Sequence, residues 1–172
     1  VNVVCSDETT DNLGALISPH IDYHRGGVAY AHAYRALVER AGDARTFVIF
    51  GTSHAGCEGL FGLTRKGYET PLGLVPCHTE LLDDIVSRCD GDEWFAGDYA
   101  HRGEHSIELQ AVWLRWMFPG DERLRIVPIL CGSLHPGMDS DEHPADSERL
   151  EAMVTAVRDA LEARGEAAVI VA

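Results

Sequence analysis

Short apolar runs alternate with amphipathic stretches along almost the whole chain. An apolar run of about four to eight residues that is bounded by turn residues is typical of a buried strand. The hydrophobic pattern predicts strands over residues 14–19, 45–51, 60–64, 125–130 and 168–172.

Between these runs, apolar residues recur at the three- and four-residue spacing of an amphipathic helix. In the first such stretch Tyr30, Tyr34 and Leu37 fall on one face, and Gly42 follows as a cap residue. The same reasoning predicts helices over residues 27–41, 79–88, 107–118 and 150–161, the last of them stopping near Gly165. Strands that alternate with helices predict a single α/β domain over residues 1–172, with a mostly parallel sheet between two helical layers.

Three segments carry weaker signals. Gly26 and Gly27 are expected to loosen a loop ahead of the first helix, and residues 67–73 read as a turn-rich excursion. Residues 89–102 are too rich in Asp, Glu and Gly for a good helix, so we expect a loop or an edge strand there.

Charge and composition narrow the class of partner. The 172 residues carry a formal charge of −14, which disfavours binding to nucleic acid or to an anionic membrane surface. No apolar run approaches the length of a membrane span. The five cysteines form no CxxC pair, so a disulfide framework is not expected and a reducing, cytoplasmic compartment fits better.

Two histidines follow two of the predicted strands. His20 comes directly after residues 14–19, and His54 follows residues 45–51 across a short turn of small residues. The carboxyl ends of parallel strands meet at the edge where open α/β sheets bind ligands. We therefore expect both imidazoles in one crevice, as candidate ligands of a metal ion.

Two imidazoles alone make a poor catalytic site, so a third ligand is needed, whether for zinc or for a non-haem iron. Within the chain, the candidates for it are Glu104, Asp22, Cys57 and His24. Asp22 and His24 are close enough to His20 in sequence to orient its ring instead.

Glu104 and His105 stand at the start of the predicted helix over residues 107–118, which is apolar nearly all round. One interpretation is catalytic, with His105 as an acid–base group and Glu104 as its orienting carboxylate. The other is structural, with Glu104 complementing the free N–H groups of the first helical turn. The sequence leaves both open.

Five ordered motifs resemble those of the Memo family, whose prokaryotic members are named AmmeMemoRadiSam for an association with a radical-SAM protein and a third partner. They cover nearly all of the chain after residue 13. In chain order they are Ser18-Pro-His20 with Gly26-Gly27, Gly51-Thr-Ser-His54, Tyr68-Glu-Thr-Pro-Leu-Gly73, Glu104-His-Ser-Ile-Glu108 and Val127-Pro-Ile-Leu-Cys-Gly-Ser-Leu134.

The resemblance implies a fold like that of the class III extradiol dioxygenases, a three-layer α/β/α sandwich with a metal site at the strand ends. It implies that His20 and His54 bind the metal and that His105 lines the pocket. It also implies that the third ligand is a cysteine beyond Ala172, so that this chain is the N-terminal part of a longer one. This chain departs from the family in having Ile21-Asp22 where small residues are expected.

Two functions follow as expectations. The first is a Memo-like metal-binding protein, an oxidoreductase that uses iron or copper, with zinc as a further option, on a small-molecule or peptide ligand. The alternative is a non-catalytic module that uses the same pocket to hold a peptide, a partner protein or a metal in transit. Radical-SAM proteins are the partners that the resemblance implies.

Overall fold

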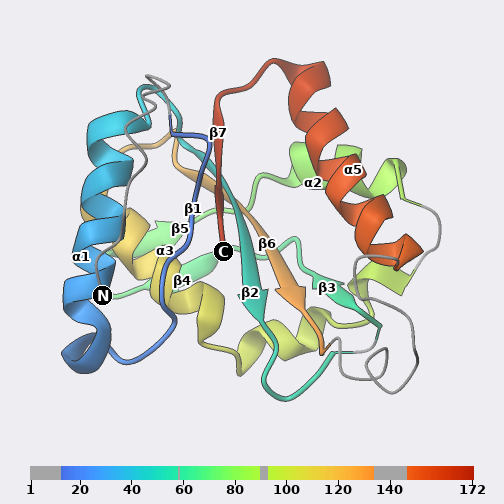
Figure 1. Ribbon diagram of the computed structural model, residues 1–172, viewed down its shortest axis with the longest axis horizontal. Coiled ribbons are helices and arrows are strands. Elements are labelled where there is room, and N and C mark those ends of the chain that lie inside the picture. The colour runs from blue at the N-terminus through green and yellow to red at the C-terminus, as the bar shows by residue number, and fades with distance from the viewer. Residues whose placement is uncertain (1–12, 58, 90–92, 134–146) are drawn as a thin grey trace.

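A five-stranded sheet forms the centre of the computed structural model, which describes residues 13–57, 59–89, 93–133 and 147–172 (Figure 1). The first four strands in the sheet order are parallel to their neighbours, and β3 pairs antiparallel with β6. This confirms a mostly parallel α/β sheet. Its order is β1 (Ala15–Leu16), β7 (Ala168–Val171), β2 (Thr46–Thr52), β6 (Arg125–Cys131), β3 (Phe61–Leu63).

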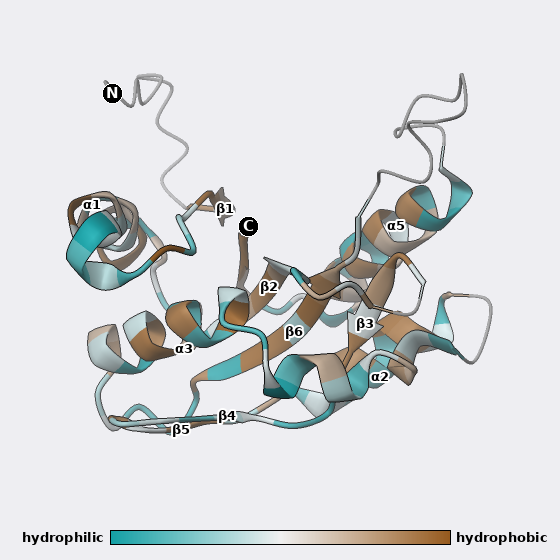
Figure 2. Ribbon diagram, turned by 90° about the horizontal axis from the view of Figure 1, so that it is seen from below, coloured by the Kyte–Doolittle hydropathy of each residue, from teal (hydrophilic) through white to brown (hydrophobic). Residues whose placement is uncertain are grey.

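Helices cover both faces of the sheet, as the three-layer prediction requires (Figure 2). On one side lie α1 (Tyr23–Arg40) and α3 (Ser106–Met117), and on the other α2 (Thr79–Ser87) and α5 (Glu148–Arg164). None of the helices in the described ranges is long and apolar enough to cross a membrane.

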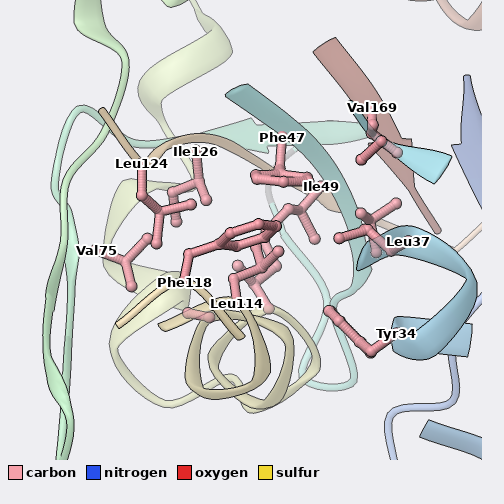
Figure 3. Close-up of a cluster of buried hydrophobic side chains, with 14 of the residues drawn as sticks. Tyr34, Leu37, Phe47, Ile49, Val75, Leu114, Phe118, Leu124, Ile126 and Val169 are labelled. Carbon is pink, nitrogen blue, oxygen red and sulfur yellow. The ribbon is translucent and has the colours of Figure 1, made fainter. Parts of the chain in front are cut away.

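Alternating side chains of the strands build two separate cores. Phe47 and Ile49 of β2 point to the α1 and α3 side, where they meet Leu37 and Leu114 (Figure 3). Val48, between them, points to the α2 and α5 side. A strand buried on both faces needs apolar residues at successive positions, which is why residues 45–51 read as a continuous apolar run.

The turn-rich segment forms a hairpin of β4 (Tyr68–Thr70) and β5 (Gly73–Val75), which packs beside α3. Its turn closes with a hydrogen bond from the Thr70 hydroxyl to the Gly73 carbonyl, and Gly73 has a φ of +117°, which favours glycine. The described part of residues 89–102 contains no strand, and forms two short 3-10 helices, η1 (Glu93–Phe95) and η2 (Asp98–Arg102).

Two boundaries near His20 differ from the prediction. Only Ala15 and Leu16 of the expected strand pair as a regular strand, although Ser18 N–H still donates to the Ala172 carbonyl. The prediction of a loop at Gly26 and Gly27 was wrong, because α1 already begins at Tyr23 and contains both glycines. Gly26 allows close packing there, since a Cβ on it would lie 2.5 Å from Ile21 Cγ2.

Candidate metal centre

Three histidines converge at the carboxyl edge of the parallel strands. The ring centroids of His20 and His54 are 5.2 Å apart, so the two predicted residues lie side by side. His105 joins them, with its ring stacked on His54 at 4.8 Å and lying 6.1 Å from His20.

The loop that carries His20 is tied to α3 by a glutamine. Gln110 Nε2 donates to the carbonyl of Pro19 at 2.8 Å, and Gln110 Oε1 accepts from the Tyr34 hydroxyl at 2.8 Å. Gln110 is 4% exposed, so both bonds are shielded from water. One side chain of α3 therefore holds the residue before His20, and α1 holds that side chain in turn.

Gly51 lets α3 approach the end of β2. A Cβ on Gly51 would lie 2.5 Å from Ile107 Cγ1 and 2.6 Å from Ser106 Oγ, which is closer than packed atoms come. Ser106 Oγ also donates to the Thr52 carbonyl at 2.8 Å. This close contact brings the beginning of α3, with Glu104 and His105, against the loop that carries His54.

The carboxylate of Glu104 contacts both of the stacked histidines. Its Oε2 accepts from the backbone N–H of His54 at 2.7 Å, and its Oε1 accepts from the N–H groups of His105 and Ser106 at 2.8 and 3.3 Å. Oε1 also lies 2.9 Å from Nδ1 of His54 and 3.2 Å from Nδ1 of His105. Glu104 thus complements the start of α3 and also contacts both rings, and the acid–base role of His105 stays a prediction.

These contacts determine which ring nitrogen of His54 is available. A carboxylate can only accept, so Nδ1 of His54 carries the hydrogen and Nε2 keeps its lone pair. The side chain of Glu104 is 5% exposed while those of His54 and His105 are 48% and 50% exposed. A buried carboxylate behind an exposed imidazole is the arrangement that commonly orients metal-binding histidines.

The same contacts set the electrostatics of the site. Burial tends to raise the pKa of the Glu104 carboxyl, but hydrogen bonds from His54, Ser106 and His105 outweigh it and lower that pKa. The pKa of His20 is lowered, first by burial and then by the neighbouring His54 and His105. Both effects favour an ionised Glu104 beside a neutral His20.

Within the described residues, His54, Glu104 and His105 form a group that could hold a metal ion. Of the two predicted ligands this group contains His54 but not His20, and it includes Glu104, one of the candidates for the third ligand, together with His105, which was expected to line the pocket. Asp22 is the N-cap of α1 and His24 lies in its first turn. Both are exposed, and among the described residues neither side chain forms a hydrogen bond to His20. Cys57 is also outside the group.

A small cavity of about 250 Å³ adjoins His20. Its apolar walls include Phe50 and Val171, and its polar walls include Gln110 and Ser18, whose buried hydroxyl has no hydrogen-bond partner among the described residues. Sequence reasoning missed Gln110, because a lone glutamine inside an apolar helix gives no signal that it binds a distant loop.

The fold and the site define a class: an α/β/α protein with a histidine–carboxylate cluster at the carboxyl edge of its parallel strands. The family model of the Memo-like proteins matches residues 3–160, and the chain belongs to that family.

The sequence of the chain is also similar to those of individual members of this family. The chain is 38% identical over 121 residues to a MEMO1 family protein of Methanosarcina mazei, an overlap of 70% of this chain and 41% of that protein. It is 32% identical over 162 residues to one of Pyrococcus abyssi, covering 93% of this chain and 51% of the other. The chain therefore spans about half the length of the curated relatives that it matches.

Proposed function

We propose that this Memo-like chain supplies the histidine ligands of a transition-metal centre. His20 and His54 hold the metal, His105 stands beside them as an acid–base group, and Glu104 orients both His54 and His105. The observation that carries the proposal is the Glu104 carboxylate, which lies 2.9 Å from Nδ1 of His54 and leaves Nε2 of that ring without a partner among the described residues.

The donor set fits the metals that the family resemblance implies. Neutral imidazoles suit iron, copper and zinc, whereas magnesium and calcium prefer oxygen donors. Glu104 is a poor direct ligand, because its two oxygens already accept from three backbone N–H groups. When bound, iron or copper supplies Lewis acidity and a change of oxidation state at this edge.

The protein residues have separate tasks in this proposal. His105 is half-exposed and can exchange a proton with a ligand through Nε2, while Glu104 stabilises the charge that its ring then carries. The cavity beside His20 accommodates the apolar part of a small ligand. Gln110 keeps the His20 loop in place while the ligand enters.

Metal analysis of the purified chain tests this assignment. After incubation with ferrous iron, copper or zinc and removal of excess ion, we expect bound metal in the unchanged protein and little in the double variant His20→Ala/His54→Ala. His32→Ala is the matched control, because it removes an exposed histidine of α1 and leaves the cluster intact. Equal metal content in the double variant would refute the assignment.

Oxygen uptake separates an oxidoreductase from a metal-holding module. The protein loaded with ferrous iron is given a panel of catechols, and uptake that His105→Gln reduces would support the oxidoreductase. Retained metal without uptake would favour the non-catalytic alternative. The association with radical-SAM partners stays a prediction.

A further inference from the structure

A second cavity, of about 390 Å³, lies on the other side of Glu104. It is formed by the segment that joins β3 to β4, by η2 and by the first turn of α3. Glu104 is in its wall, but His20, His54 and His105 are not. This cavity is therefore adjacent to the candidate metal centre and distinct from the smaller cavity beside His20.

A buried histidine fixes a tyrosine hydroxyl in the wall of this cavity. His101 is 7% exposed, and its Nε2 lies 2.9 Å from the Gly62 carbonyl, which can only accept a hydrogen bond. Nε2 thus carries the hydrogen, and Nδ1 accepts from the Tyr68 hydroxyl at 2.9 Å. Because its hydrogen is committed to His101, the Tyr68 oxygen offers a ligand only lone pairs.

Burial, followed by the charges of Glu108 and Glu104, raises the pKa of Tyr68, so its hydroxyl stays protonated. Glu104 and Glu108 line the same cavity as that hydroxyl. The inner wall of the cavity therefore presents hydrogen-bond acceptors, which favours a ligand that donates hydrogen bonds.

The charged groups around the cavity are only partly compensated. Lys66 is neutralised by Asp98 at 2.5 Å. In the described ranges neither Glu69 nor Glu108 forms an ion pair, and Arg102 contacts only the Tyr99 hydroxyl at 3.5 Å and the Tyr99 ring. Within these ranges Glu69 and Glu108 thus lack a paired cation, and Arg102 lacks a paired anion, in a chain of net charge −14.

A bare metal ion does not suit this arrangement. Among the described residues, Glu69 and Glu108 belong to no group of three donors close enough to share an ion. An organic ligand of some length can reach them both. Tyr68 and Tyr99 also line the cavity. Tyr99 is 74% exposed, and although the Arg102 guanidinium lies 5.8 Å from its ring centroid, the exposed ring can pack against an aromatic partner.

We propose that this second cavity binds a small organic ammonium compound with an aromatic body. Its ammonium group donates to the Tyr68 oxygen and to Glu108, and its ring packs against Tyr99. The cavity volume falls within the range of small-molecule sites, about 300–1,000 Å³. Ligand binding in this cavity does not require the metal, so this proposal can be tested separately from the proposed metal centre.

Titration calorimetry of the 172-residue chain, in the presence of a chelator, tests the proposal with three probes of similar shape. Phenethylamine carries the ammonium group, phenethyl alcohol is its neutral counterpart, and phenylacetate is an anion. We expect saturable binding of phenethylamine, at least about tenfold tighter than that of the other two, because a charge-assisted hydrogen bond is stronger than a neutral one.

Variants assign the binding to the cavity. Glu108→Gln should weaken phenethylamine binding about tenfold, and Tyr68→Phe should weaken it by a smaller factor. Glu69→Gln removes the second exposed carboxylate of the cavity. Glu151→Gln on α5 is the control, and it should bind phenethylamine as the unchanged protein does. Equal affinity for phenethyl alcohol, tighter binding of phenylacetate, or unchanged affinity in both Glu108→Gln and Glu69→Gln would overturn the proposal.

Discussion

Two histidine–glutamate pairs lie at opposite edges of the sheet. At the carboxyl edge, His54 contacts Glu104 at 2.9 Å; at the amino edge, His78 lies 3.1 Å from both oxygens of Glu166. His78 has a second bond, because its Nδ1 accepts from the Leu81 N–H and thereby caps α2. Both ring nitrogens of His78 are thus occupied, whereas Nε2 of His54 has no partner among the described residues.

The two histidine–glutamate pairs also differ in how exposed their histidines are to solvent. The side chain of His78 is 14% exposed and joins the starts of α2, β2 and β7 through Glu166, which also accepts from the Thr46 hydroxyl. The side chain of His54 is 48% exposed and faces two further histidines. A histidine–carboxylate contact alone is therefore no sign of a metal site. The useful sign is a second nitrogen left available at an open, ligand-facing edge.

The largest difference should come from Glu104→Gln. The amide cannot orient both rings or accept every backbone N–H, so metal affinity should fall about 10- to 100-fold and stability by about 1–3 kcal/mol. Competition with a chromogenic chelator measures the first effect, and denaturant unfolding the second. If metal affinity is unchanged, Glu104 has no orienting role.

A smaller effect on the same edge should come from Gly51→Ala. The added Cβ would overlap Ile107 and Ser106, and such overpacking costs about 1–3 kcal/mol. Gly103→Ala is the matched control, because a Cβ there meets no atom within 4 Å. Urea unfolding of both variants should show a clear loss only for Gly51→Ala. Equal stabilities would mean that α3 does not need this close approach.

The smallest effect should come from Glu166→Gln at the amino edge. Burial tends to raise the pKa of Glu166, but hydrogen bonds from Thr46 and the charge of His78 lower it below its ordinary 4.5. Because the pKa of Glu166 is lower in the folded state than its ordinary value, the ionised carboxylate stabilises the folded protein at pH values above 4.5. This stability is lost as the pH falls through the folded-state pKa.

Glu166→Gln should therefore cost about 1 kcal/mol at neutral pH and less in acid. Metal affinity should not change, in contrast to Glu104→Gln. Unfolding at pH values on either side of the titration, with a parallel metal titration, provides the check. A loss of metal binding in Glu166→Gln would contradict the view that only the His54–Glu104 pair serves the metal centre.

Much of the fold was predictable, because apolar periodicity reports burial directly. The strands predicted over residues 45–51 and 125–130 nearly match β2 (Thr46–Thr52) and β6 (Arg125–Cys131). The closeness of His20 and His54 followed from the parallel arrangement of the strands. Periodicity could not show that Gly26 and Gly27 lie inside α1. Helix propensity argues against two glycines there, but Gly26 leaves room for the Ile21 side chain, because a Cβ at position 26 would lie 2.5 Å from Ile21 Cγ2.

The sequence indicated that His20, His54 and His105 lie at this edge of the sheet, but it did not indicate their contacts. Sequence position could not show whether Glu104 touches the ring of His105 or that of His54, which is 50 residues away. It gave no sign of Gln110 holding Pro19, or of His101 holding Tyr68, because these bonds join segments that only the folded chain brings together. Long-range polar contacts leave no periodic pattern in a sequence.

The most direct test of the central claim is nitrogen NMR of the histidine rings, with zinc as a diamagnetic probe. Before zinc is added, His54 should carry its hydrogen on Nδ1. On titration, we expect the Nε2 signals of His20 and His54 to shift strongly while both nitrogens of His78 stay where they are. Zinc on Nδ1 of His54, or a shift at His78 with none at His54, would contradict the account.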